Sequence, residues 1–216
     1  MASKLKVDEI EVASASTVKL NSTLAVDTIK DASATNTLVE QSGADWKWGS
    51  GVPSSTILQI VQSTKSDTAS STSASFVDIV GTDQAGSGSV WCCKITPSAT
   101  SSKILVNFSI NFGGEAGGFS PQFQMFRDST QIYMGDERSD RTRSWIGGLQ
   151  YHDLSMQNVH AMYLDSTSST SELLYKAKYR TETTAYEIHV NKNETDSDTS
   201  QYFTTFSNIM LMEIAG

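Results

Sequence analysis

The sequence predicts an all-β protein with antiparallel sheets, in which a short repetitive segment precedes a larger folded unit. Three observations lead to this prediction. Apolar and polar residues alternate in many short stretches, and this period of two places one side of a strand in a core. Ser, Thr, Asp and Gly residues, which favour turns, separate these stretches. No window of 11 or more residues has apolar residues at helical spacing.

The clearest element is the corner at residues 95–110. Pro97 cannot donate to a β-ladder, so we expect the preceding strand to end there. The Ser and Thr residues that follow favour a turn, because their hydroxyls can hydrogen-bond the nearby backbone. After the turn, one apolar side of the next strand is formed by alternating residues: Ile104, Val106, Phe108 and Ile110.

Several blocks of the sequence resemble one protein family. In chain order from about Thr56 to Gly216 they are ILQIVQSTKSDTASSTSASFVDI, ITPSATSSKILVNFSI, QMFRDSTQIYMG, HAMYLDSTSST and LMEIAG. They look like the C-terminal head domain of short virion fibre proteins of tailed bacteriophages, many of them phages of marine bacteria. The resemblance implies a jelly-roll head, similar to the trimeric heads of tumour-necrosis-factor-like proteins. It also implies a structural role and no chemistry.

Residues 1–45 carry a short internal repeat. The pattern that begins at Leu5 recurs nineteen positions later at Leu24. Two such units cannot bury a face of their own, since repeats become stable only by stacking on neighbours. We interpret the segment as a shaft or virion-docking segment that pairs with sister chains or a docking protein, and the alternative is a flexible tail. The candidate docking residues are its apolar positions: Leu5, Val7, Ile10, Leu24, Val26 and Ile29.

Residues 46–55 are predicted to form a neck between this segment and the head. Gly and Ser residues loosen the segment, and Pro53 fixes a turn before the next strand. Trp46 and Trp48 share one side if the backbone is extended. Aromatic residues are favoured at interfaces, so the two rings suit a subunit or domain junction. The alternative is a stacking platform for a sugar.

From residue 56 to residue 216 we expect a jelly-roll-like β-sandwich head built from short antiparallel strands. Exposed sheet edges are a liability in such folds, and both the resemblance and the composition suggest that packing of three copies, a homotrimer, manages them. The predicted strands lie near residues 56–62, 75–81, 89–96, 103–113, 119–127, 130–134, 142–150, 158–164, 172–180, 185–190 and 202–214.

Composition and charge narrow the function classes. The chain has 216 residues, which fits one domain plus an appendage or at most two domains. Its net charge of −8 argues against nucleic-acid partners, which need a basic surface, and against an anionic membrane surface. No signal peptide is recognisable, and no run approaches the roughly 18 apolar residues of a membrane span. We expect a protein that is made in the host cytoplasm and reaches the outside by cell lysis, without membrane insertion.

The residue types that usually carry metal or nucleophile chemistry are sparse. His152, His160 and His189 lack metal-ligand spacing, so we expect ordinary surface or strand histidines. Cys92 and Cys93 are adjacent and point to opposite faces of a strand, which predicts one core thiol and one half-exposed thiol. We therefore predict no metal, no cofactor and no catalytic residues.

Two loops are candidates for binding. Residues 136–145 combine six charges with a tryptophan, and Arg138, Arg141, Arg143 and Trp145 are the candidate binding residues. Arginine can bind glycans bidentately, and a tryptophan ring can stack on a sugar. The alternatives are a solvated loop, an inter-subunit ion-pair network, or a Trp145 ring buried at the start of the next strand. Residues 191–198 have acidic residues at calcium-like spacing, without the glycine and final glutamate of an EF-hand loop.

The sequence therefore leads us to expect a non-enzymatic virion fibre, in the tail or on the capsid, whose head contacts a glycan or protein on the bacterial surface. Its other partners would be phage structural proteins. Three alternatives stay open: a capsid decoration fibre without a receptor role, a cellular lectin-like or adhesive module, and a glycan-active tailspike enzyme. The enzyme would need two carboxylates across a groove, and the loop candidates are Glu115, Asp136, Asp140 and Asp165.

Overall fold

The computed structural model describes residues 28–30, 37–42, 45–48, 52–115, 119–148, 154–195, 197–200 and 202–216. Within these residues every regular element is a β-strand, and every strand pairing is antiparallel. The all-β prediction is therefore confirmed. In this described part of the chain, no helix has the length and apolar character needed to cross a membrane. The chain divides into two compact units, Met1–Val52 and Pro53–Gly216.

The smaller unit contains a three-stranded sheet in the order β1 (Thr28–Lys30), β2 (Thr37–Ser42) and β3 (Asp45–Trp48). Of the predicted docking residues, Ile29 lies in β1 and pairs with Val39 of β2. β3 contains both tryptophans of the segment predicted to be the neck, and it pairs along its whole length with β2. The other predicted docking residues lie outside the described residues: Leu5, Val7, Ile10, Leu24 and Val26.

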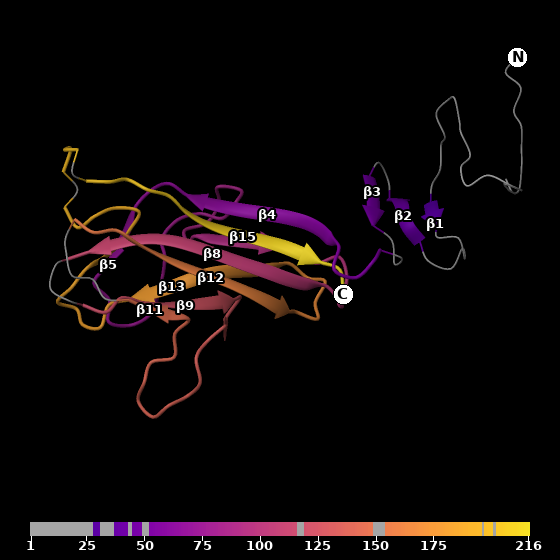
Figure 1. Ribbon diagram of the computed structural model, residues 1–216. Helices are drawn as coiled ribbons and strands as arrows, with labels where there is room; N and C mark the ends of the chain where they lie inside the picture. The colour runs from indigo at the N-terminus through magenta and orange to yellow at the C-terminus, as the bar shows by residue number, and fades with distance from the viewer. Residues whose placement is uncertain are drawn as a thin grey trace, which may run out of the picture. The chain divides into compact units, whose positions relative to one another are not determined.

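The larger unit consists of two six-stranded sheets that lie one over the other (Figure 1). The β8 sheet has the order β4-β15-β8-β12, and β14 and β5 continue it beside the end of β8. Its strands are β4 (Ile57–Lys65), β5 (Ala69–Ser71), β8 (Lys103–Gly114), β12 (Gln157–Ser166), β14 (Ile188–Val190) and β15 (Ser207–Ile214). The β13 sheet has the order β10-β9-β13-β6, with β11 beside β9 and β7 beside β13. Its strands are β6 (Val77–Asp78), β7 (Cys92–Ile95), β9 (Gln122–Arg127), β10 (Thr130–Ile132), β11 (Ile146–Gly147) and β13 (Leu173–Arg180).

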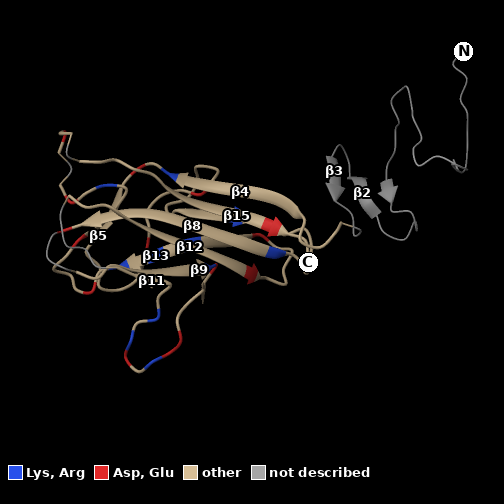
Figure 2. Cartoon of the chain, viewed as in Figure 1, with Lys and Arg blue, Asp and Glu red and all other residues tan. Residues whose placement is uncertain are grey.

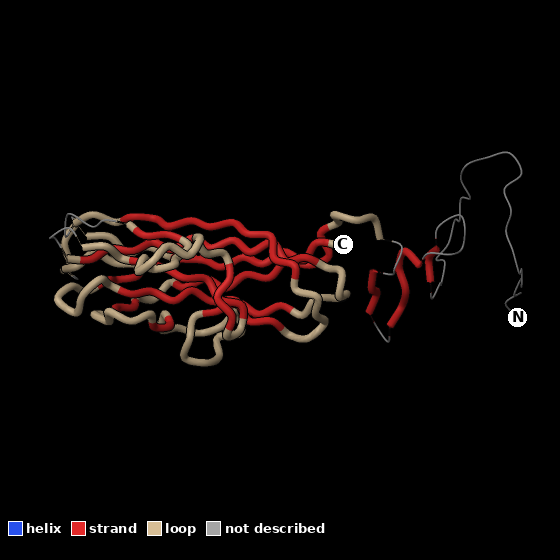
Figure 3. Tube along the Cα trace, turned by 90° about the horizontal axis from the view of Figure 1, so that it is seen from below, coloured by secondary structure: helices blue, strands red, loops and turns tan. Residues whose placement is uncertain are grey.

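The chain changes sheet repeatedly as it runs along the larger unit. β7 of the β13 sheet leads to β8, which leads back to β9, and β12 of the β8 sheet leads to β13. The last strand, β15, returns to lie between β4 and β8. Figure 3 shows the strands running along the unit with loops at both of its ends. This alternation explains why most of the stabilising contacts join residues far apart in sequence.

The core lies between the two sheets. The predicted apolar side of β8 is fully buried, as the alternation at residues 103–113 predicted. The ring of Phe112 on β8 lies 5.3 Å from that of Phe123 on β9, so side chains of the two sheets meet in the middle. Burial of one such side chain stabilises the fold by about 1.5–3 kcal/mol.

The predicted thiol environment was wrong for one of the two cysteines. Cys92 and Cys93 are both buried and both free. The two residues do point to opposite faces of β7, but the loop before β7 folds back beside the outer one. In this loop Gln84 exchanges two hydrogen bonds with the backbone of Lys94, at 2.9 and 3.0 Å. Burial raises the pKa of both thiols, that of Cys93 to about 12.

Candidate functional site

The two ends of the larger unit differ in what they carry. At one end its first and last residues pair: Ser55 N–H donates to the carbonyl of Ala215, and Ala215 N–H donates to the carbonyl of Thr56, both at 2.8 Å. At the opposite end, where β8 reaches Gly114, the chain forms the long connection between β14 and β15. We call residues 191–206 the end loop. Residues 55–56 and Ala215 thus lie at the end of the unit away from this loop.

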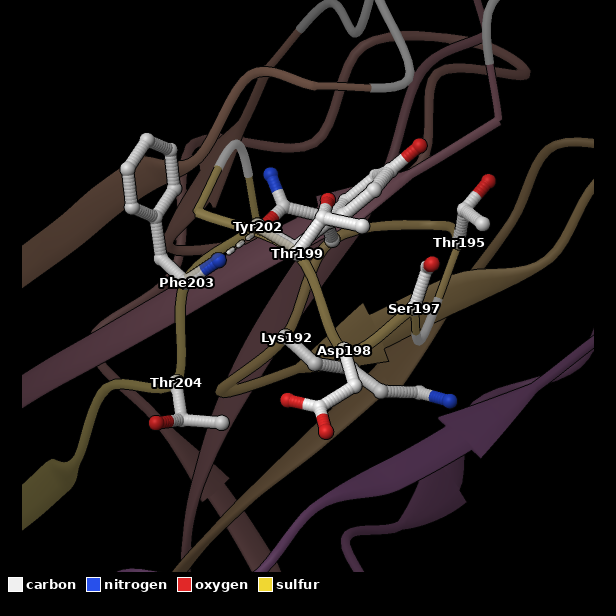
Figure 4. Close-up of a pocket in the computed structure, with 9 residues that line it drawn as sticks. Lys192, Thr195, Ser197, Asp198, Thr199, Tyr202, Phe203 and Thr204 are labelled. Carbon is white, nitrogen blue, oxygen red and sulfur yellow. Dashed lines mark hydrogen bonds between the residues drawn. The ribbon is translucent and has the colours of Figure 1, made fainter.

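Described residues of the end loop line an open pocket of about 390 Å³ (Figure 4). Buried Asn193 holds its base: the side-chain Oδ1 accepts a hydrogen bond from Phe203 N–H at 2.8 Å, and Nδ2 donates to the carbonyl of Leu154 at 2.6 Å. A backbone bridge between Lys192 and Thr204 closes the loop beside it. The buried Asn193 amide therefore joins Phe203 of the pocket lining to the backbone of Leu154.

The lining of the pocket is polar with aromatic residues beside it. Figure 4 shows the hydroxyls of Thr195, Ser197 and Thr199 together with the Asp198 carboxylate and the Lys192 amine. The side chain of Phe203 is 51% exposed. Hydroxyls and a carboxylate supply hydrogen bonds to polar ligands, and an exposed ring supplies an apolar surface. This combination is suited to a saccharide, whose ring has polar edges and an apolar face.

The cation suggested by residues 191–198 has little support in the described geometry. Asp196, one of the three acidic residues in that stretch, lies outside the described residues. Among the residues that are described, no group of three or more His, Cys, Asp or Glu side chains is placed to hold a metal ion. The chemistry that the described lining offers is hydrogen bonding.

The predicted binding arginines lie on a separate loop. The segment between β10 and β11 extends away from both sheets and carries charges of both signs (Figure 2). Arg138 and Arg141 are exposed and flank a turn in which Arg141 N–H donates to the carbonyl of Arg138 at 3.0 Å. Arg143 lies nearer the sheets, and its Nε donates to the carbonyl of Gly135 at 2.8 Å. The first two guanidinium groups face solvent, and the third closes the loop.

Trp145 does not lie on this exposed surface. Its ring centre lies 5.5 Å from that of Phe108 and 6.0 Å from that of Phe123, so the indole packs against the core. Its backbone N–H donates to the carbonyl of Phe123 at 3.0 Å, immediately before β11. The structure thus has the alternative in which Trp145 begins a strand with its ring inside. The structure therefore places the Trp145 ring in the core and not beside Arg138 and Arg141 on the exposed loop.

The four carboxylates considered for a tailspike enzyme are not brought together. Asp136 and Asp140 lie on the exposed loop between β10 and β11. Asp165 is buried and pairs in register with Ile104, near the start of β8. Glu115 follows the last residue of β8, roughly 30 Å further along that strand. These positions belong to different parts of the unit.

The sequence singled out residues 191–198 as a loop, but it assigned the other wall of the pocket, residues 202–204, to a strand. The predicted strand at 202–214 begins at Ser207, and the preceding residues form the wall of the pocket instead. Tyr202 and Phe203 fit a strand by residue type, and only the distant partner Asn193 decides otherwise. When the chain is compared with known proteins, no family model matches it, and no curated protein sequence matches it either.

Proposed function

We propose that this chain is a non-enzymatic fibre protein of a tailed-phage virion. Its N-terminal segment docks to the particle, and its larger unit projects outward to contact the bacterial surface. The observation that carries this proposal is that the two ends of the larger unit differ. Its first and last residues pair at one end, and the pocket lies in the end loop at the other. A receptor-binding head needs this separation of anchor and contact surface.

The order of the strands supports a jelly roll as the finer architecture. The order of neighbours in the β8 sheet is β4, β15, β8 and β12. In the β13 sheet, β13 lies between β9 and the short strands β6 and β7, and β9 is followed by the short strands β10 and β11. A jelly roll distributes eight strands over two sheets in this alternating way. The sequence blocks that resemble fibre heads point to the same architecture.

A homotrimer is the assembly that we propose for the fibre. Among the described strands β12 pairs only with β8, so this ten-residue strand lies at an edge of the described sheet. Long open edges invite uncontrolled pairing with other chains. Threefold packing covers such edges and gives the small N-terminal sheet neighbours to stack on.

The end-loop pocket is the proposed contact with a bacterial saccharide. Replacing both Phe203 and Asp198 by Ala removes the exposed ring and the carboxylate, and we expect adsorption of the phage to its host to fall at least tenfold, about 1.4 kcal/mol. Arg138→Ala together with Arg141→Ala is the matched control on the other loop. Both variants should melt like the wild type, because exposed loop side chains contribute little to the core. A decoration role without receptor contact follows if neither variant adsorbs less.

The docking part of the proposal has its own test. A chain without residues 1–52 keeps the whole larger unit and loses the smaller one. Supplied in trans to a phage that lacks the gene, it should no longer co-purify with particles, whereas the full chain should. Normal incorporation of the shortened chain would place the docking surface in the larger unit.

A further inference from the structure

The outer side of the β8 sheet carries an uncharged and partly apolar surface. One row of side chains crosses all four long strands: Ile60, Met212, Leu105 and Leu164, which are neighbours in the strand register. The next row contains Met210 and Met162, separated by Asn107. Their inward-pointing sequence neighbours on β8, β12 and β15 are the buried core residues. We call this outward side of β4, β15, β8 and β12 the neutral face.

The neutral face is exposed in the single chain. Ile60 is 55% exposed, Met162 56% and Leu164 44%, and Ile57 at the end of the same face is 50% exposed. Single exposed apolar residues are common on protein surfaces, but contiguous apolar rows mark interaction sites. These side chains therefore point to a covering partner.

Charge separates the neutral face from the outer side of the other sheet. Among the described outward positions of the four strands, Lys103 at the margin carries the one formal charge. The outer side of the β13 sheet has charges on its central strand and beside it: Asp78, Lys94, Lys176, Lys178 and Arg180. Figure 2 shows β4, β15, β8 and β12 uncharged over most of their length. A face kept free of charge in a chain of net charge −8 is suited to contact with another uncharged surface.

We propose that the neutral face is the surface through which copies of this chain pack together, with three such faces turned toward a common threefold axis. This inference rests on the homotrimer of the proposed function and adds the surface that forms it. Around a threefold axis each residue near the axis meets its own copies. A charged residue there would repel its copies, whereas an amide such as Asn107 or Asn208 can donate to one copy and accept from another.

The size of the neutral face approaches that of a stable interface. Four strands at about 4.8 Å spacing and about nine residues of length give a flat area of roughly 20 Å by 30 Å, or about 600 Å² per copy. Stable protein interfaces bury about 800 Å² per partner, so the flat estimate is about three quarters of that area, and side-chain relief adds to it. A second copy also matches the charge of the face, because it brings an equally uncharged surface.

The test introduces charge into the neutral face of the full chain. The test variant combines Met162→Asp with Leu164→Asp. Both positions are exposed and point outward, so the substitutions leave the core intact. Light scattering of the wild type should give about three times the 23.4 kDa chain mass, and this variant should fall towards the mass of one chain at the same concentration. Val80→Asp is the matched control, since Val80 is 60% exposed and lies outside the face. The control should keep the trimer mass.

A second measurement keeps the test decisive if the charged variant does not fold. Met210→Cys places a thiol in the middle of the face, and a short bismaleimide should then link copies covalently, whereas Val80→Cys should give no linked product. In light scattering, the inference is overturned by a monomeric wild type, by a charged variant that keeps the trimer mass, or by a control that dissociates equally. In crosslinking, it is overturned by equal linking of the two cysteine variants. A trimer that survives the charged variant leaves the proposed virion function standing. Absence of the protein from phage particles would remove that function and leave the mass result unaffected.

Discussion

Glu213 of β15 binds Ser98 twice: its Oε1 accepts hydrogen bonds from the backbone N–H and from the hydroxyl of Ser98, each at 2.6 Å. The Ser102 hydroxyl donates to the same oxygen at 2.7 Å, and Gln59 Nε2 donates to Oε2 at 2.6 Å. The Glu213 side chain is fully buried. It therefore fixes the corner between β7 and β8 to the last strand of the chain.

This contact makes the stability of the protein depend on pH in a defined direction. Burial alone would raise the pKa of Glu213, but the hydrogen bonds from Ser98, Ser102 and Gln59 outweigh it and hold the pKa below the usual 4.5. Because the folded-state pKa is depressed, the stabilisation is complete above about pH 4.5 and is lost as the pH falls through the folded-state value. We expect Glu213→Gln to lower stability by about 1–3 kcal/mol at pH 7 and to flatten the acid side of the melting profile. Equal acid sensitivity of variant and wild type in thermal melts at pH 3–7 would contradict this role.

The sequence could predict β15 as a strand but not which of its sides is buried. Ile209 and Leu211 occupy one side and Met210 and Met212 the other, so both sides of the strand are apolar. Glu213 lies on the buried side, where a charged residue is rare unless it has partners. Those partners come from segments more than a hundred residues away, which no local pattern contains.

Trp145 should act on stability and not directly on binding. Its ring packs on Phe108 and Phe123, so Trp145→Ala removes core contacts and should cost about 3 kcal/mol of unfolding free energy. Arg141→Ala, four residues earlier and exposed, should leave thermal melting unchanged. Chemical denaturation of both variants measures the difference. A Trp145→Ala protein of wild-type stability that adsorbs poorly would instead restore the tryptophan to a binding surface.

An ion pair between buried Asp165 and half-buried Arg127 ties the two sheets together near the end of the larger unit where Ser55 and Ala215 pair. Asp165 of β12 accepts hydrogen bonds at 2.8 Å from Arg127 of β9 and from the Tyr175 hydroxyl of β13. Asp165→Ala should therefore destabilise the fold by about 3 kcal/mol, since it leaves Arg127 without its charge partner. Ser166→Ala, the next residue and exposed, is the control. If denaturant melts gave both variants the same stability, the ion pair between Asp165 and Arg127 would not contribute to the stability of the fold.

The two free thiols should be unreactive in the native protein. Cys92 is 4% exposed and Cys93 is fully buried, and burial raises the pKa of each thiol. A thiol reagent such as Ellman's reagent at pH 8 should label neither residue until denaturant unfolds the chain, and should then label both. Rapid labelling of one thiol without denaturant would show that the loop before β7 does not cover Cys92.

Sequence reasoning succeeded where local alternation decides the structure and failed where distant partners decide it. The alternation from Ile104 to Ile110 predicted the buried side of β8 correctly. β5 has only Ala69, Ser70 and Ser71, which carry no strand pattern, and it exists because β14 pairs with it. Residues 202–206 were assigned to a strand for the same reason, since the hydrogen bond from Phe203 N–H to Asn193 holds them in the end loop instead.

The most direct measurement of the central claim is peptide mass spectrometry with copy counting on purified particles of the phage that encodes this chain. A virion fibre predicts that its peptides remain with the particles through gradient purification, at a copy number that is a multiple of three. A chain found only in the lysate of infected cells, and absent from purified particles, would contradict the account.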